Sequence, residues 1–128
     1  MTFVLSKRSL AKLEGVHPDL VRVVKRAIEL SEIDFCVTEG VRTLERQAQL
    51  LKAGASRTMK SRHLTGHAVD LAAMMGGEIR WDWPLYSKLA LAMKKSANEL
   101  DVPLEWGGDW KAFKDGPHFQ LPWKEYPV

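Results

Sequence analysis

The chain has 128 residues, of which 45% are hydrophobic and 27% charged, and a formal net charge of +3. This length suits one domain with a real hydrophobic core and is too short for two ordinary domains. The single cysteine, Cys36, excludes an intrachain disulfide and a multi-cysteine zinc site, and no apolar run approaches the roughly 18 residues of a membrane span. The basic residues are spread along the chain without a nucleic-acid-binding motif. We therefore expect one soluble domain, with neither nucleic acid nor an inserted membrane as partner.

Two helices are predicted at the start of the chain. The segment SKRSLAKLEG offers Ser6 as an N-cap and a glycine as a stop, and HPDLVRVVKRAIELSE has a proline in its first turn followed by apolar residues at helical spacing. No motif is found in residues 1–34, so their role rests on these helices alone. DFCVTEG then predicts a strand that ends at Gly40, and TLERQAQLLKAG predicts a helix that begins after Thr43.

The second half of the chain predicts strands around one long helix. ASRTMKSRH is basic and lacks periodicity, which indicates an exposed loop. Two strand-like runs in HAVDLAAMMGGEIRWDW surround Gly76 and Gly77, a pair suited to a tight hairpin turn. A helix from Pro84 to about Leu100 follows, and VPLEWGGDW and GPHFQLPW predict two short extended segments. This order indicates the α+β class, a small antiparallel sheet with helices packed against it.

The stretch SRHLTGHAVD contains two histidines four residues apart and an aspartate. His63 and His67 would lie on one face of a helix, where such pairs can share a zinc ion. However, Gly66 lies between them, the glutamate of H-E-x-x-H is absent, and the residues that follow favour a strand. We therefore expect a loop that turns at Gly66 into a strand containing Asp70.

Alternation of side chains along strands suggests how a metal site could form. Asp70 lies on the strand face opposite apolar neighbours, and in PHFQL the same alternation separates His118 from Phe119. If these strands are neighbours, Asp70 and His118 project to one spot and His63 can supply a third ligand. Two imidazoles and a carboxylate with an open fourth position form a catalytic zinc shell, in which the pKa of a bound water falls toward about 7.

Three further polar residues are candidates for roles at this site. Asp115, in the turn DGPH, is placed to accept a proton from water as a general base. Arg42, just after the first strand, suits a carbonyl oxygen or a substrate carboxylate, and Ser61 can add a neutral hydrogen bond. Simpler roles stay open for two of them: Asp115 as a turn former, and Arg42 as the ion-pair partner of Glu39 or Glu45.

These motifs resemble those of the zinc peptidases that include D-alanyl-D-alanine carboxypeptidases, vancomycin-resistance D,D-peptidases and phage L-alanyl-D-glutamate endolysins. The pattern S-x-H-x-x-G-x-A-x-D is matched by Ser61, His63, Gly66, Ala68 and Asp70, and DGPH matches the family's second motif. EWGGDW is similar to the stretch that precedes that motif in the endolysins, and the resemblance extends from about residue 35 to 123. It implies zinc binding by His63, Asp70 and His118, base catalysis by Asp115, and oxyanion stabilisation or substrate orientation by Arg42 with Ser61. It implies no role for His67.

The resemblance favours a phage or prophage endolysin that hydrolyses the L-alanyl-D-glutamate bond of the peptidoglycan stem peptide. We expect residues 1–128 to form a single catalytic domain, monomeric and without a separate wall-binding domain. It would be made in the host cytoplasm without a signal peptide and reach the wall in the periplasm through a lesion formed by a holin-type partner. Two alternatives stay open: a D-Ala-D-Ala carboxypeptidase or dipeptidase on the same fold, and a zinc-bearing wall-binding module without catalysis.

Overall fold

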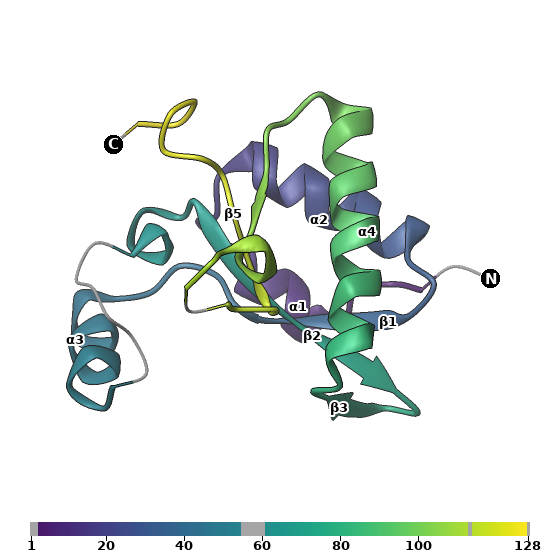
Figure 1. Cartoon of the computed structure of the whole chain (residues 1–128), viewed down its shortest axis with the longest axis horizontal. Helices are drawn as coiled ribbons and strands as arrows, with labels where there is room; N and C mark the ends of the chain where they lie inside the picture. The colour runs from purple at the N-terminus through teal and green to yellow at the C-terminus, as the bar shows by residue number, and fades with distance from the viewer. Residues whose placement is uncertain (1–2, 55–60, 113, 128) are drawn as a thin grey trace.

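The computed structural model describes residues 3–54, 61–112 and 114–127, and Figure 1 shows how their helices and strands are arranged. The elements in chain order are α1 (Lys7–Lys12), α2 (Pro18–Leu30), β1 (Asp34–Glu39), α3 (Leu44–Lys52), the 3-10 helix η1 (Arg62–Thr65), β2 (Ala68–Met75), β3 (Glu78–Arg80), α4 (Trp83–Leu100), β4 (Glu105–Trp106), the 3-10 helix η2 (Gly107–Asp109) and β5 (His118–Gln120). The predicted α+β class is confirmed. Within the described ranges, no helix is both long and apolar enough to cross a membrane.

The predicted helix starts agree with the structure because the expected capping groups are in place. The hydroxyl oxygens of Ser6 and Thr43 each accept a hydrogen bond from the backbone amide three residues on, at the starts of α1 and α3. Helix α2 begins at Pro18, directly after His17, whose Nδ1 accepts a backbone hydrogen bond. α3 lies at one end of the molecule, apart from α1, α2 and α4 (Figure 1).

The sheet is antiparallel, with strands in the spatial order β1-β2-β5-β4, and β3 pairs with the far end of β2. Gly76 and Gly77, both with positive φ, form the predicted hairpin turn between β2 and β3. Asp70 of β2 lies directly opposite His118 of β5 on one side and opposite Glu39 of β1 on the other. The prediction that the strands of Asp70 and His118 are neighbours is therefore confirmed.

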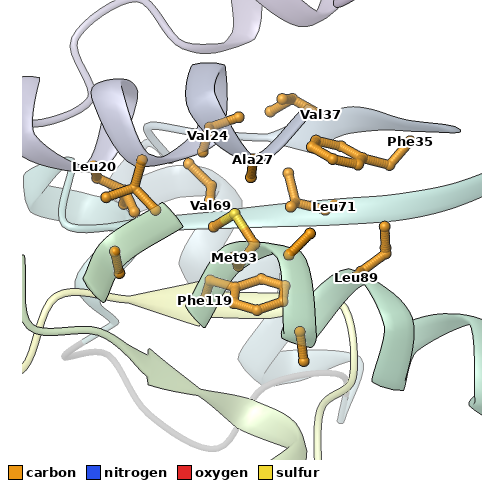
Figure 2. Packing of buried hydrophobic residues seen from close by; sticks show 14 of the residues in the cluster. Leu20, Val24, Ala27, Phe35, Val37, Val69, Leu71, Leu89, Met93 and Phe119 are labelled. Atoms are coloured by element: carbon orange, nitrogen blue, oxygen red, sulfur yellow. The ribbon is translucent and has the colours of Figure 1, made fainter. Parts of the chain in front are cut away.

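The other face of the sheet carries the hydrophobic core. Val69 and Leu71, which alternate with Asp70 along β2, are fully buried with Phe119 of β5. Helices α2 and α4 pack against each other and against this face (Figure 2), where they bury Leu20, Val24, Ala27, Leu89 and Met93. Full burial of each large apolar side chain contributes about 1.5–3 kcal/mol, so this layer strongly determines which face Asp70 and His118 occupy.

The expectation of an exposed loop at ASRTMKSRH is wrong for its last residues, while residues 55–60 lie outside the described part of the chain. Arg62 and His63 belong to η1 and are only 2% and 1% exposed. The Arg62 guanidinium donates to three carbonyl oxygens within residues 121–126 and lies 4.0 Å from the centre of the Trp123 ring. The guanidinium of Arg62 therefore binds the C-terminal segment through these contacts, which the sequence around Arg62 does not predict.

Gly66 ends η1 in the left-handed conformation, with φ of 77°, and a Cβ there would lie 2.5 Å from the Gly15 carbonyl oxygen. We expect Gly66→Ala to lower the free energy of unfolding by about 2–4 kcal/mol, because the backbone would be both strained and displaced. Gly76→Ala is the matched control, since its φ is also positive but a Cβ would meet nothing within 4 Å. That change should cost only about 1 kcal/mol. Urea denaturation measures both, and equal losses would contradict the packing explanation.

Candidate metal centre and active site

Three side chains from separate segments converge on the face of the sheet opposite the hydrophobic core: His63 of η1, Asp70 of β2 and His118 of β5. One ligand atom of each lies within 4.8 Å of the other two. The Asp70 Oδ1 atom is 3.2 Å from His63 Nε2 and 3.2 Å from His118 Nδ1. The structure thus brings together the three residues that the sequence predicts. Among the described residues, no other three His, Cys, Asp or Glu side chains come this close.

The remaining nitrogen of each imidazole is held by an oxygen acceptor. His63 Nδ1 donates to the Gly40 carbonyl oxygen at 2.8 Å, and His118 Nε2 donates to Gln120 Oε1 at 2.7 Å. Such acceptors fix the ring orientation, so that the other nitrogen can bind a cation once it gives up the proton that it shares with Asp70. His63 Nε2 and His118 Nδ1 therefore face Asp70 as two nitrogen donors beside one carboxylate. This donor set fits zinc, which takes imidazole nitrogen and carboxylate oxygen and keeps one position open in catalytic sites.

The charges of the centre favour an ionised carboxylate. Burial opposes ionisation of Asp70, but the hydrogen bonds to His118 and His63 outweigh it and hold the pKa of Asp70 well below its usual range. Burial likewise opposes protonation of His118, yet the pKa of His118 is raised because Asp70 lies beside it. Asp70 is consequently negative at neutral pH, as a carboxylate ligand of a cation must be.

Arg42 connects the metal centre to β1 and α3. Its Nε and Nη2 donate to the two carboxylate oxygens of Glu39 at 2.6 and 2.7 Å, and Nη1 donates to Gln47 Oε1 at 2.7 Å. This contact lowers the pKa of Glu39. The Glu39 partner is one of the two that the sequence left open. Nη2 also lies 3.9 Å from Asp70 Oδ2 and Nη1 3.4 Å from Ser61 Oγ, so the tip of the guanidinium faces the metal centre.

Asp115 lies in the loop between η2 and β5 and is half-buried. Its backbone amide donates to the Gly107 carbonyl oxygen at 3.0 Å, and a Cβ on Gly107 would overlap the Asp115 carbonyl oxygen. Burial, and then the charge of Asp70, raise the pKa of the Asp115 carboxyl, while His118, His63 and Arg42 oppose this. No described residue donates a hydrogen bond to the Asp115 carboxylate. Such a group is able to exchange protons within the site.

Ser61 and His67 differ in their relation to the centre. Ser61 Oγ caps η1 by accepting a hydrogen bond from the His63 amide, which places the hydroxyl near Arg42. His67 is not part of the ligand group: its Nδ1 is 2.7 Å from Thr65 Oγ1, and its ring faces that of His17 at 5.4 Å between centroids. The sequence likewise did not place His67 among the three expected ligands.

Sequence reasoning missed three groups that support the centre: the Gly40 carbonyl, Gln47 and Gln120. Gln120 had a signal, because alternation in PHFQL places it on the same face as His118. Gln47 had none, because it is a polar side chain fully buried within a largely exposed helix. Only the folded chain brings it to Arg42.

Comparison with known proteins finds similarity to one peptidase family along most of the chain. The family model described as phage L-alanyl-D-glutamate peptidase matches residues 1–121, which includes the N-terminal helices. The L-alanyl-D-glutamate peptidase of Escherichia phage T5 is 37% identical over 119 residues, covering 90% of this chain and 87% of that protein. The crystal structure of the Serratia marcescens L-Ala D-Glu endopeptidase ChiX is 48% identical, with a TM-score of 0.93 over 98% of this chain and 95% of that one.

A more distant solved structure shares the fold alone. The vancomycin-resistance D,D-dipeptidase VanXYg is 21% identical, with a TM-score of 0.54 over 83% of this chain and 50% of that one. The sequence had suggested a resemblance to both branches, the D,D-peptidases and the phage endolysins. Sequence identity, coverage and structural superposition all favour the phage endolysins. The chain belongs to the phage L-alanyl-D-glutamate peptidase family.

Proposed function

We propose that this chain is a zinc-dependent peptidoglycan peptidase that hydrolyses the L-alanyl-D-glutamate bond of the stem peptide, as a phage or prophage endolysin in host lysis. The observation that carries the proposal is a group of three metal donors beside a carboxylate, Asp115, to which no described residue donates a hydrogen bond. The choice of bond is supported by the family and by the names of its members.

The residues of the centre divide the chemistry between them. His63, Asp70 and His118 would hold zinc, which when bound would supply Lewis acidity to polarise the scissile carbonyl and to make water more acidic. Asp115 accepts the proton of the attacking water and passes it to the leaving amine. Arg42 stabilises the negative charge that develops on the carbonyl oxygen, and Ser61 adds a hydrogen bond. Glu39 and Gln47 hold the guanidinium in place, so it needs no reorganisation during the reaction.

Chelation tests the metal. Dialysis against a chelator should remove about one zinc ion per chain and abolish peptidoglycan hydrolysis. The three donor side chains cannot themselves supply the Lewis acidity of the cation. Adding one equivalent of zinc should restore the activity. Elemental analysis and turnover are measured on the same samples, and a metal-free protein with full activity would refute the zinc mechanism.

Product analysis tests the bond. Purified peptidoglycan digested by the protein should yield new D-glutamyl amino termini, detected by mass spectrometry. Release of free D-alanine without those termini would support the alternative of a D-Ala-D-Ala carboxypeptidase or dipeptidase. Retention on peptidoglycan without any cleavage product would support a non-catalytic wall-binding module. Digestion with the Asp115→Ala variant controls for contaminating hydrolases.

We further propose that the chain acts as a single catalytic domain and a monomer, on the wall in the periplasm, after a holin-type partner has opened the membrane. The net charge of +3 favours contact with anionic wall polymers. Expression in a bacterial host with and without a holin tests this route: lysis should require both proteins. Lysis by this chain alone would show that another export route exists.

A further inference from the structure

A surface pocket of about 550 Å³ opens beside the metal centre, between α1, the end of β1 and the start of α3. Its charged lining residues are Lys12, Glu14, Glu39, Arg42 and Arg46. The pocket shares two wall residues with the centre. The carbonyl of one, Gly40, holds the His63 ring, and the other, Arg42, approaches Asp70 at 3.9 Å.

The cations of this pocket differ in how far they are already engaged. Arg42 is committed to Glu39 through two hydrogen bonds and to Gln47 through a third. That ion pair also neutralises the carboxylate of Glu39 within the pocket. Lys12 and Arg46 are exposed, and no described residue forms an ion pair with either. A carboxylate entering the pocket therefore meets two available cations, whereas Arg42 already donates three hydrogen bonds to Glu39 and Gln47.

We propose that the pocket binds the acidic peptide on the leaving-group side of the scissile bond, where Lys12 and Arg46 pair with its carboxylates. This inference rests on the proposed function. The D-glutamyl residue after the cut is linked onward through its side chain, so its α-carboxylate is free, and the next residues add further carboxylates. The pocket volume of about 550 Å³ lies within the roughly 300–1,000 Å³ of small-ligand sites, which suits a short peptide. Glu14, which also lines the pocket, would suit the ammonium group of a diamino acid at the third position.

Two synthetic stem tripeptides of one sequence test this subsite. One carries free D-glutamyl and C-terminal carboxylates, and the other carries both groups as amides. The wild type should cleave the carboxylate form with about tenfold higher kcat/KM, as expected for two partly exposed ion pairs. In a Lys12→Ala/Arg46→Ala variant this ratio should fall to near one. Lys88→Ala removes another exposed cation, on α4 and outside the pocket, and should keep the wild-type ratio.

The outcomes separate the subsite from the proposed function. If the wild type cleaves both peptides at the L-alanyl-D-glutamate bond and the double variant keeps the wild-type ratio, the subsite is wrong and the proposed function stands. A wild type with no preference between the peptides also refutes the subsite. If the wild type cleaves neither peptide at that bond, both fail. The single variants Lys12→Gln and Arg46→Gln keep most of each side chain, and each should give an intermediate ratio of kcat/KM values. They replace the double variant in this test if it does not fold.

Discussion

Asp115→Ala is expected to lower turnover steeply and to leave zinc binding unchanged. The carboxylate is not among the three donors that converge on the sheet, so the cation keeps its ligands. Its burial and raised pKa suit a group that takes up a proton during the reaction. Because general-base catalysis contributes about 10²–10⁴-fold, kcat/KM should fall by about 10³-fold.

The experiment pairs zinc stoichiometry with kcat/KM on one preparation of the variant. Asp109→Ala is the matched control, because it removes a second aspartate from the preceding η2 turn, where the side chain is exposed and pairs with Lys94 at 2.7 Å. That variant should retain wild-type turnover. Near-normal activity of Asp115→Ala would refute the general base, and loss of zinc from it would show that Asp115 supports the metal instead.

His63→Ala is expected to lose both zinc and activity. The substitution removes one of three donors and also leaves the Gly40 carbonyl without its partner. Loss of an outer partner of a ligand alone lowers metal affinity about 10–100-fold, so loss of the ligand should lower it by more than about 100-fold. Zinc should raise the melting temperature of the wild type, since it binds only the folded chain, and should not raise that of the variant.

His67→Ala provides the control for that experiment. It removes an imidazole four residues away, which contacts Thr65 and His17 rather than the centre. Zinc affinity is measured by competition with a chromophoric chelator, and His67→Ala should match the wild type. Normal affinity of His63→Ala would refute its role as a ligand, and an equal loss in both variants would place His67 in the centre.

The core of the metal centre was predictable because it depends on strand alternation. Asp70 and His118 are polar residues set between apolar neighbours, so their faces follow from the requirement to bury the apolar side. Pairing of the two strands was the only further assumption, and the register confirms it. Helix starts were predictable for a similar reason, because Ser6 and Thr43 act on amides only three residues away.

What the sequence could not predict depends on contacts between distant segments. Arg62 lies in a basic stretch that indicates exposure, yet its guanidinium reaches carbonyl groups about 60 residues further along the chain. Gln47 supports Arg42 only because α3 folds back beside the end of β1. For Asp115, the turn expected as the alternative is present, since its carbonyl oxygen accepts a hydrogen bond from the His118 amide at 3.2 Å, and base catalysis stays a prediction.

The pairing of Asp70 with His118 has a consequence for how this site tolerates change. Their spacing is set by a ladder between two strands, so changes of length in the turns between Met75 and His118, outside β3, α4 and β4, should leave the two ligands where they are. Asp115 has no such protection, because its position depends on a loop held against Gly107. Variation in loop length should therefore alter the rate of hydrolysis while the affinity for the cation persists. During evolution, changes in loop length are then expected to produce chains of this fold that still bind the metal ion but no longer catalyse hydrolysis.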